Sequence, residues 1–561
     1  WIRHLPVGYK DWWLNAATND PIHVIVETSL LAFVVYLLIL TRNKDYKFRK
    51  EQKLTSKEQE DLLEEWKNRG RASLAPSPSQ MSSLFTAATA TTSVPIVSSM
   101  NGRTMEILVP SKDNDHDADD KENTIMNHAI ISSVFKKKKS RKESQMKKSP
   151  SSTSCSNEDE KSSNSSEEEN ISLSSGVRKQ TVLNFATNDF LGFASSSEVK
   201  DASLAALKKY GCGSCGPRGF YGTIDVHLEL EAQMASYVGT EQAILYSDGA
   251  SAVSSTIAAF CKRGDLIIVD EGVYEPIVTG VTLSRANVIW FKHNDMEDLK
   301  RVLKQVEQKD KKLGRASNDQ RRFIVVEGLY KNSGTVCPLD KLVELKHEFK
   351  YRLILDETHS FGTLAPKGCL DFFSKRYMYD AEIVTIGLET TLAGIGGMTV
   401  GNEEVVDHQR LSGAGYCFSA SSPPFTATAA MASLSLLMQE TSLTKKLQSN
   451  LKYFHQQLSK SSILSSSFTR SSHENSPLIQ LEFEADQDRA DRLQWIQMIV
   501  EECLTNGVAF VASRRYNHAH QPPPALCMTV SCTHTHADID QAISVLEQAC
   551  ESVSSKKQQE N

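Results

Sequence analysis

The protein has 561 residues, of which 40% are hydrophobic and 24% are charged, and its formal net charge is −6. This composition is typical of globular proteins, and the modest acidic charge argues against a nucleic-acid-binding surface. The 11 cysteines are an odd number scattered over a long chain. They suit a reducing compartment better than a disulfide framework.

Residues 22–40 predict a transmembrane helix. This stretch is almost wholly apolar, with Glu27 as its single charge, and about 19 helical residues span about 28 Å, close to the hydrocarbon thickness. A signal peptide fits less well, because basic residues follow the apolar run in place of a small-residue cleavage site. A buried core helix is the other alternative. The basic C-terminal flank places residues 1–21 on the lumenal side and the rest in the cytosol.

The next two segments change in composition. Residues 41–69 form a juxtamembrane segment in which Leu54–Arg69 predicts an amphipathic helix at the membrane surface. Residues 70–178 are rich in Ser, Thr, Asn, Lys and Glu, and they predict a disordered insertion. The basic run Lys136–Lys139 is a solvated linker, an anionic-lipid site or a nuclear signal.

From about residue 179 the pattern is globular. Short apolar runs alternate with helical patterns up to residue 439, which predicts a mostly parallel sheet with helices on both faces. The expected strands are 243–247, 266–270, 288–291, 322–328, 352–357, 383–388 and 397–400. Residues 440–552 predict a smaller α+β domain with strands 477–483 and 525–531 and a closing helix Ala537–Glu551, and residues 553–561 are a tail.

Four motifs carry a resemblance to a known family. They are NFATNDFLGF (184–193), YGCGSCGPRGFYGTIDVHLELE (210–231), DETHSFG (356–362) and VDHQRLSGAGYCFSASSPP (406–424). In this order they resemble the α-oxoamine synthases, which are fold-type-I transferases dependent on pyridoxal 5'-phosphate (PLP). The resemblance covers about 370 residues. It implies an α/β fold with a mostly parallel seven-stranded sheet, one antiparallel strand and a smaller α+β C-terminal domain.

The resemblance also implies that the catalytic lysine is absent. The loop within Ile383–Asn402 is similar to the family's lysine loop, T-K-S-F-G-x-x-G-G, and aligning Gly396-Gly397 puts Thr390 at the lysine position. No lysine occurs from Arg376 to Thr444. Tyr274 stands where relatives place a histidine stacked on the PLP ring, and Cys527 lies near the expected substrate-carboxylate arginine. We therefore expect this chain to be inactive alone.

Other cofactor positions are retained. Asp356, at the end of a buried strand, corresponds to the aspartate that faces the pyridine nitrogen, and His359 would lie near the ring hydroxyl. The alternative is an aspartate that caps the strand end and a packed histidine. The turn with Gly249, Ala250 and Ser251 matches the phosphate-binding helix start. We expect any binding of PLP there to be weak or vestigial.

A further group resembles the family's segments at the dimer interface. Its members are Cys215, Arg218, Tyr221, Ser419 and Ser421, and the two serines would reach toward the partner's PLP phosphate. A redox or zinc site at Cys212-x-x-Cys215 is the alternative, but no second cysteine pair follows at finger spacing.

We also expect no metal site, although four histidines stand close together in the sequence. They are His518, His520, His534 and His536, and the pattern places them at polar loop ends.

The resemblance implies a heterodimer that condenses L-serine with palmitoyl-CoA to 3-ketodihydrosphingosine, releasing CO2 and CoA. A lysine-bearing, subunit-2-like chain would bind PLP covalently, and small membrane regulatory subunits are further candidate partners. The implied location is the endoplasmic reticulum membrane. Two alternatives are a self-sufficient PLP enzyme with a relocated lysine and a membrane regulatory protein without catalysis.

Overall fold

The computed structural model describes residues 96–110, 177–315, 320–483, 489–513 and 522–560. All of them fall within one compact unit of the chain, made of residues 94–118 and 144–561. In these ranges no helix is long and apolar enough to cross a membrane. The predicted segments 1–21, 22–40 and 41–69 lie outside them.

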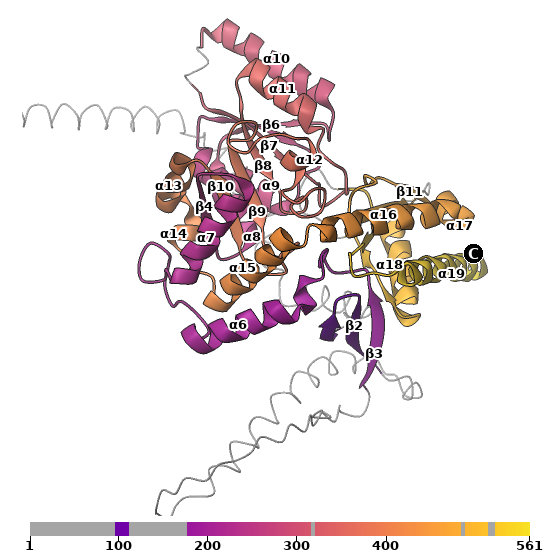
Figure 1. The fold of residues 1–561 in the computed structure, drawn as a ribbon. Helices are drawn as coiled ribbons and strands as arrows, with labels where there is room; N and C mark the ends of the chain where they lie inside the picture. Colours follow the sequence, from indigo (N-terminus) through magenta and orange to yellow (C-terminus); the bar gives the residue numbers. More distant parts are fainter. Residues whose placement is uncertain (1–95, 111–176, 316–319, 484–488, 514–521, 561) are drawn as a thin grey trace, which may run out of the picture. The chain divides into compact units, whose positions relative to one another are not determined.

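A seven-stranded sheet forms the large domain (Figure 1). Its strands are β4 (Gln242–Tyr246), β5 (Leu266–Asp270), β6 (Asn287–Phe291), β7 (Arg322–Glu327), β8 (Arg352–Asp356), β9 (Ile383–Gly387) and β10 (Gly397–Gly401). They run in the order β4-β10-β9-β8-β7-β5-β6. Strand β10 runs antiparallel to β4 and β9 on its two sides, and the other neighbouring pairs are parallel. The predicted strands and the single antiparallel strand are confirmed.

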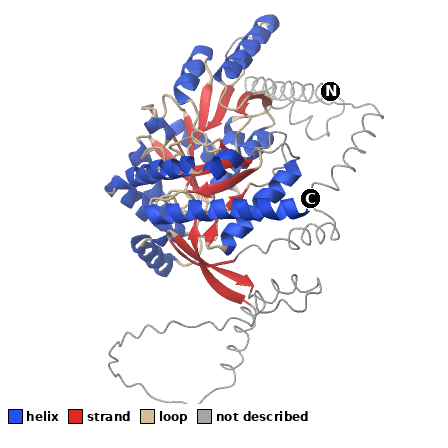
Figure 2. Cartoon of the chain, turned by 90° about the vertical axis from the view of Figure 1, so that its right-hand side faces the viewer, coloured by secondary structure: helices blue, strands red, loops and turns tan. Residues whose placement is uncertain are grey.

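Helices lie on both sides of this sheet (Figures 1 and 2). They are α6 (Ser197–Tyr210), α7 (Asp225–Val238), α8 (Gly249–Phe260), α9 (Glu275–Ser284), α10 (Met296–Leu313), α11 (Leu339–Phe349), α12 (Cys369–Phe372), α13 (Glu403–Ser412), α14 (Ala414–Cys417) and α15 (Pro424–Gln439). Side chains fix several helix starts: Asp248 caps α8, Asp295 caps α10 and Asn402 caps α13. Each accepts a backbone N–H that the first helical turn leaves unpaired.

The C-terminal domain is built on a second sheet. Its strands, in order, are β11 (Phe468–Arg470), β12 (Leu478–Phe483), β15 (Ala525–Thr529) and β14 (Val511–Ala512), and its helices are α16 (Ser442–Lys460), α17 (Ser462–Ser467), α18 (Arg489–Thr505) and α19 (His536–Glu560). The predicted closing helix is present but longer, because α19 continues to Glu560. Most of the predicted tail, residues 553–561, therefore belongs to the last turns of α19.

Part of the predicted disordered insertion is ordered, which corrects that prediction. Within 70–178 the chain forms a hairpin of β1 (Ile96–Asn101) and β2 (Thr104–Pro110), and β2 pairs with β3 (Val177–Asn184). The parallel strand β13 (Val508–Ala509) completes this sheet. Met105 and Ile107 are buried against Val182 and Ala509. The other residues of 70–176 lie outside the described ranges.

Replacing Ile107 with Ala should destabilise the fold by about 2–4 kcal/mol, because a fully buried side chain is lost and a cavity remains. Denaturant unfolding measures the change. Val97, on β1 but 45% exposed, is the matched control, and Val97→Ala should cost less than about 0.5 kcal/mol. Equal effects of the two substitutions would show that the hairpin does not pack as described.

Candidate cofactor site

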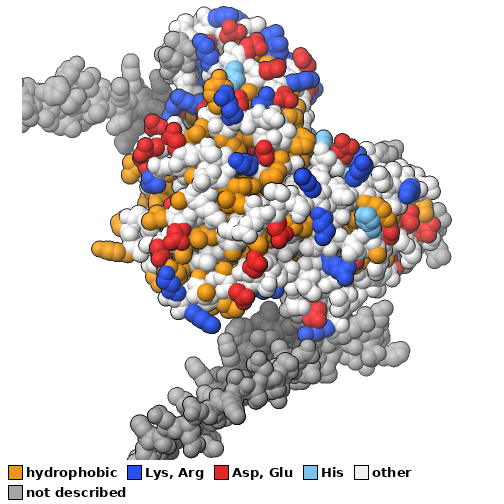
Figure 3. Space-filling view, viewed as in Figure 1, with side chains coloured by type: hydrophobic (Ala, Val, Ile, Leu, Met, Phe, Trp, Pro, Cys, Tyr) orange, Lys and Arg blue, Asp and Glu red, His pale blue; other side chains and the backbone are white. Residues whose placement is uncertain are grey.

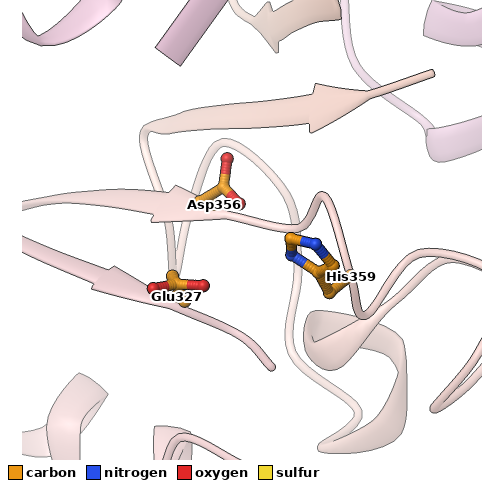
Figure 4. A group of neighbouring side chains, drawn as sticks. All are labelled: Glu327, Asp356 and His359. Atoms are coloured by element: carbon orange, nitrogen blue, oxygen red, sulfur yellow. The ribbon is translucent and has the colours of Figure 1, made fainter. Parts of the chain in front are cut away.

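The candidate site lies where β7 and β8 end. Glu327 is the last residue of β7, Asp356 is the last residue of β8, and His359 follows in the next loop (Figure 4). All three are buried, and their potential ligand atoms lie within 4.8 Å of one another. Because parallel neighbours end at the same edge, the sheet itself brings these side chains together.

Asp356 is held by hydroxyl groups. Its Oδ2 accepts hydrogen bonds from Thr358 Oγ1 at 3.0 Å and from Thr385 Oγ1 at 2.6 Å, and its Oδ1 accepts from the Thr358 backbone N–H at 3.2 Å. Burial raises the pKa of Asp356 to about 6, and the hydrogen bonds from Thr385 and Thr358 oppose that rise. The carboxyl group therefore ionises below neutral pH in spite of its burial.

Glu327 was missed in the sequence, where it reads only as the end of an apolar strand. Its Oε1 accepts from the Tyr274 N–H at 2.7 Å, and its Oε2 accepts from the Lys331 N–H at 2.9 Å. Burial raises its pKa well above the usual value, and the nearby Asp356 adds to the rise. All four oxygens of these two carboxyl groups already accept hydrogen bonds. The expected absence of a metal site stays a prediction.

Tyr274 and His359 face each other at this site. Their ring centroids are 5.7 Å apart in an edge-to-face arrangement. Burial lowers the pKa of His359 to about 3, so its imidazole is neutral at physiological pH. Burial raises the pKa of Tyr274 well above its usual value, and the carboxyl groups of Asp356 and Glu327 raise it further. Neither ring can act as an acid or base near neutral pH.

Tyr274 also reaches the carboxyl group that the motif assigns to the pyridine nitrogen. The side chain of Tyr274 also lowers the pKa of Asp356, after the larger effects of burial and of the bonds from Thr385 and Thr358. The backbone of Tyr274 is fixed at the start of α9 by its bond to Glu327.

Thr390 lies at the same edge of the sheet. It is buried, and its Oγ1 donates to the Thr358 carbonyl at 2.7 Å. Thr358 stands between Asp356 and His359 in the chain, so the loop between β9 and β10 meets the loop after β8 here. The assignment of Thr390 to the lysine position stays a prediction from the motif.

The predicted phosphate turn starts α8. Asp248 Oδ1 accepts the Ser251 N–H at 2.7 Å. A Cβ atom added to Gly249 would lie 2.2 Å from Glu389 Oε1, so the Glu389 carboxyl group packs directly on this glycine. Sequence reasoning missed Glu389, because no motif marks it beyond its place next to Thr390.

Lys331 was also missed. It follows β7, and its Nζ lies 5.9 Å from the ring centroid of Tyr274. Its positive charge lowers the pKa of His359, after the larger effect of burial. It therefore supplies a cation beside a group of buried carboxyl groups.

Arg218 has a structural role within this chain, and its predicted place beside a partner's site stays a prediction. Its side chain is buried, pairs with Glu231 at 2.9 Å and lies over the ring of Tyr416. Its Nε donates to Thr223 Oγ1 at 3.1 Å. The sequence could not reveal this, because the partner Glu231 stands on α7 with no spacing that marks the pair.

The other predicted interface residues lie on two connected loops. Cys215 and Tyr221 are exposed. Ser421 is buried, and both its N–H and its Oγ donate to the Gly216 carbonyl, at 2.9 and 3.1 Å. Ser419 Oγ lies 3.3 Å from Ser247 Oγ, beside the cap of α8. The loops 211–222 and 417–422 thus form one surface next to the phosphate turn.

Cys212 and Cys215 are free thiols rather than a bonded pair. Among the candidate metal histidines, His534 is buried, bonds to Asn184 O at 3.0 Å and stacks on Phe185. His536 stacks on Tyr453, and both therefore serve packing. His518 and His520 lie outside the described residues.

Cys527 lies on β15, and its Sγ donates to Gln480 Oε1 at 2.8 Å. Gln480 Nε2 in turn donates to the Lys331 carbonyl at 3.5 Å. Through Gln480, the C-terminal sheet reaches the loop after β7.

Residues 180–546 match the model of the family "Aminotransferase class I and II". The chain belongs to this family. It is 39% identical over 378 residues to "Long chain base biosynthesis protein 1c" of rice, covering 66% of this chain and 76% of that protein. It is 38% identical over 379 residues to "Serine palmitoyltransferase 1" of Dictyostelium discoideum, covering 66% and 78%.

The fold is that of known enzymes of this type. A solved serine palmitoyltransferase of Sphingomonas wittichii superimposes with a TM-score of 0.59 at 24% identity, covering 67% of this chain and 88% of that one. This confirms the predicted α/β fold-type-I transferase fold. The relatives named serine palmitoyltransferase support the resemblance that the motifs indicated, and the prediction of PLP as the family's cofactor is confirmed as well.

Replacing Arg218 with Ala should destabilise the chain by about 3–5 kcal/mol, since Glu231 would be left buried and unpaired. Calorimetry or denaturant unfolding measures this change in the free energy of unfolding. Adding Glu231→Gln should recover part of the loss, because the unpaired charge is removed. Arg301→Ala, which breaks an exposed pair with Asp298, should cost less than about 1 kcal/mol. A stable Arg218→Ala variant would instead favour a role of Arg218 toward a partner.

Glu389 should make stability depend on pH. Burial raises its pKa to about 7, Asp356 and Asp248 raise it too, and Lys331 opposes them. An acid with a raised pKa stabilises the fold fully only below its unfolded value near 4.5, and this contribution is lost as the pH rises through about 7.

The variant Glu389→Gln should therefore match the parent chain at pH 5 and unfold at a higher temperature at pH 8. The difference should stay under about 1 kcal/mol, because the carboxyl group packs against Gly249 and Gly387 while the rest of the side chain is exposed to screening by solvent. Glu404→Gln on α13, which is also exposed, is the control and should show no such trend. A Glu389→Gln effect equal at both pH values would rule out the raised pKa.

Proposed function

We propose that this chain is the non-catalytic subunit of a serine palmitoyltransferase. The complex condenses L-serine with palmitoyl-CoA to 3-ketodihydrosphingosine and releases CO2 and CoA. A lysine-bearing, subunit-2-like partner holds PLP covalently and performs the chemistry. The observation that carries this proposal is Thr390, which the motif aligns with the lysine and whose hydroxyl group donates to the Thr358 carbonyl.

The residues of the site support a non-catalytic role. A threonine has no amine with which to hold PLP covalently, and the buried Tyr274 and His359 stay neutral near pH 7. When bound in a family member, PLP supplies an electron sink for the reacting carbon. This chain retains three structural features of such a site. They are Asp356 at a strand end, Glu327, which positions the neighbouring backbone, and the start of α8.

The surface next to this frame supports a partner. Large apolar side chains are exposed on the loop between α6 and α7, where Phe220 and Tyr221 are 75% and 100% exposed. Leu411 and Phe418, near the connected loop 417–422, are 86% and 87% exposed. Figure 3 shows hydrophobic side chains on the surface on the side where Figure 1 shows this loop beside α14. Clustered exposed aromatic side chains are typical of protein interfaces.

The remaining parts of the proposal come from the sequence. The apolar run 22–40 would anchor the chain in the endoplasmic reticulum membrane, with residues 1–21 in the lumen and the globular part in the cytosol. Small membrane regulatory subunits are further candidate partners. Extraction of the full chain by alkaline carbonate, as for a peripheral protein, would argue against the anchor.

The structure suggests which lysine a self-sufficient PLP enzyme would use. A self-sufficient enzyme needs a relocated lysine, and Lys331 is the lysine whose Nζ lies near the ring of Tyr274. If the chain alone were active with PLP, and Lys331→Ala abolished that activity, this alternative would replace the proposal. A regulatory protein without catalysis would neither be active alone nor raise the activity of a lysine-bearing relative.

The central experiment compares the full chain alone, the lysine-bearing partner alone and the two co-expressed in detergent. CoA release from palmitoyl-CoA in the presence of L-serine should require both chains. The variant Thr390→Lys, without partner, should stay below about 1% of the activity of the complex, since each missing positioned group costs about 100-fold. Turnover near that of the complex from this single change would overturn the non-catalytic role.

A second variant tests the interface. Cys215→Trp places a large ring on the exposed loop 211–222, so it should lower the activity of the heterodimer at least about 10-fold through overpacking while leaving the melting temperature of this chain unchanged. Leu313→Trp, at the exposed end of α10, is the matched control and should leave activity unchanged. Full activity of the Cys215→Trp complex would place the partner elsewhere.

A further inference from the structure

We propose that two side chains of this protein, Glu389 and Tyr274, occupy the place of PLP in its own site, so that the chain is closed to the cofactor even before the missing lysine is considered. Glu389 takes the phosphate end and Tyr274 takes the ring end. This inference concerns the isolated chain and does not depend on the proposed partner.

The phosphate end is the start of α8. The first backbone N–H groups of a helix carry a partial positive charge, which is why such starts bind phosphate. In this chain the Glu389 carboxyl group already lies there. A Cβ atom on Gly249 would be 2.2 Å from its Oε1 and 2.5 Å from its Oε2, and a Cβ atom on Gly387 would be 2.9 Å from Oε2. The carboxyl group thus packs against two glycines that leave room for it, although the residue as a whole is exposed.

Electrostatics also oppose a phosphate at this point. Asp248 caps the same helix and already accepts the Ser251 N–H, so one donor of the turn is taken. A phosphate monoester brings a charge between about −1.5 and −2. It would meet two carboxyl groups, Asp248 and Glu389, with Asp356 near as well. The compensating cation, Lys331, already offsets the charge of Glu389.

At the ring end, Tyr274 lies beside the carboxyl group that the cofactor would need. In family members the aspartate at this strand end faces the pyridine nitrogen, whereas here both oxygens of Asp356 already accept hydrogen bonds from Thr358 and Thr385. Burial raises the pKa of Tyr274, and this carboxyl group lies close enough for its charge to raise that pKa further. The ring of Tyr274 is 5% exposed and lies edge-to-face with His359. His359 Nδ1 is buried without a hydrogen-bond partner. The tyrosine therefore fills the space beside the histidine without forming a hydrogen bond to this nitrogen.

The two occupants come from different elements. Tyr274 caps α9 and is fixed by Glu327, and Glu389 follows β9 beside the buried Thr390. Each should therefore be removable without the other. Of these two side chains, only Glu389 lies at the phosphate end. Its removal should therefore increase the affinity for ligands that carry a phosphate. Removal of Tyr274 should favour any pyridoxal ring.

The test uses the full chain, purified without a partner in detergent, with PLP, pyridoxal and inorganic phosphate as probes. Equilibrium dialysis measures binding, and melting temperature is a second readout. The variants are Glu389→Ala, the isosteric Glu389→Gln, Tyr274→Ala and the double alanine variant. Glu404→Ala, at an exposed glutamate of α13, measures the background of PLP on surface lysines.

We expect the parent chain to bind PLP no better than this background. Glu389→Ala should bind PLP at least 10-fold more tightly than the parent, with no gain for pyridoxal, and Glu389→Gln should show a smaller gain because charge is removed but not bulk. Tyr274→Ala should bind both PLP and pyridoxal more tightly than the parent does. The double variant should bind PLP most tightly.

Stoichiometric PLP binding by the parent chain would overturn the inference. So would an unchanged affinity in both Glu389 variants, provided that their melting temperatures show a folded chain. Either result would leave the heterodimer assay unaffected, so a failure here is distinct from a failure of the proposed function.

Discussion

The structure around the candidate site depends on burying carboxyl groups at the ends of β7 and β8. A buried carboxyl group is costly unless hydrogen bonds replace its water. Here the replacement is local: Asp356 accepts from Thr358 and Thr385, and Glu327 accepts from two backbone N–H groups. These bonds tie the loop after β8, the loop after β7 and the start of α9 into one frame. Within this frame, the oxygens of both carboxyl groups are all hydrogen-bonded to the protein itself.

This explains how a chain can keep the outline of a cofactor site without the cofactor. Removing Asp356 would leave the buried hydroxyl groups of Thr358 and Thr385 without their acceptor, at a cost of about 1–3 kcal/mol for each unsatisfied group. Thr390, likewise, is buried but satisfied by the Thr358 carbonyl. Retained Asp356 is therefore evidence of structural need, and it does not by itself indicate PLP binding.

Much of the large domain was predictable because its strands are short, mostly apolar runs separated by helical patterns. β5 and β8 match their predicted starts, and the Gly-Gly turn before β10 marked the antiparallel hairpin. The β1–β2 hairpin was hidden, because its few apolar residues lie inside a long polar segment whose average composition is that of disorder. Its burial depends on β3 and β13, which are distant in sequence.

At the site, the sequence placed Asp356, His359 and Tyr274 at one sheet edge but could not find their partners. Glu327 and Lys331 follow an ordinary strand, and Glu389 is identified only by the glycine that its carboxyl group touches. Such contacts depend on side-chain direction across loops, which no spacing rule encodes. The same limit applies to Arg218: the motif suggested a place near a shared site, but no spacing showed that Arg218 pairs with Glu231. Motifs therefore locate this site. Which ligand it can bind depends on charged side chains such as Glu389 and Lys331, which the motifs do not mark.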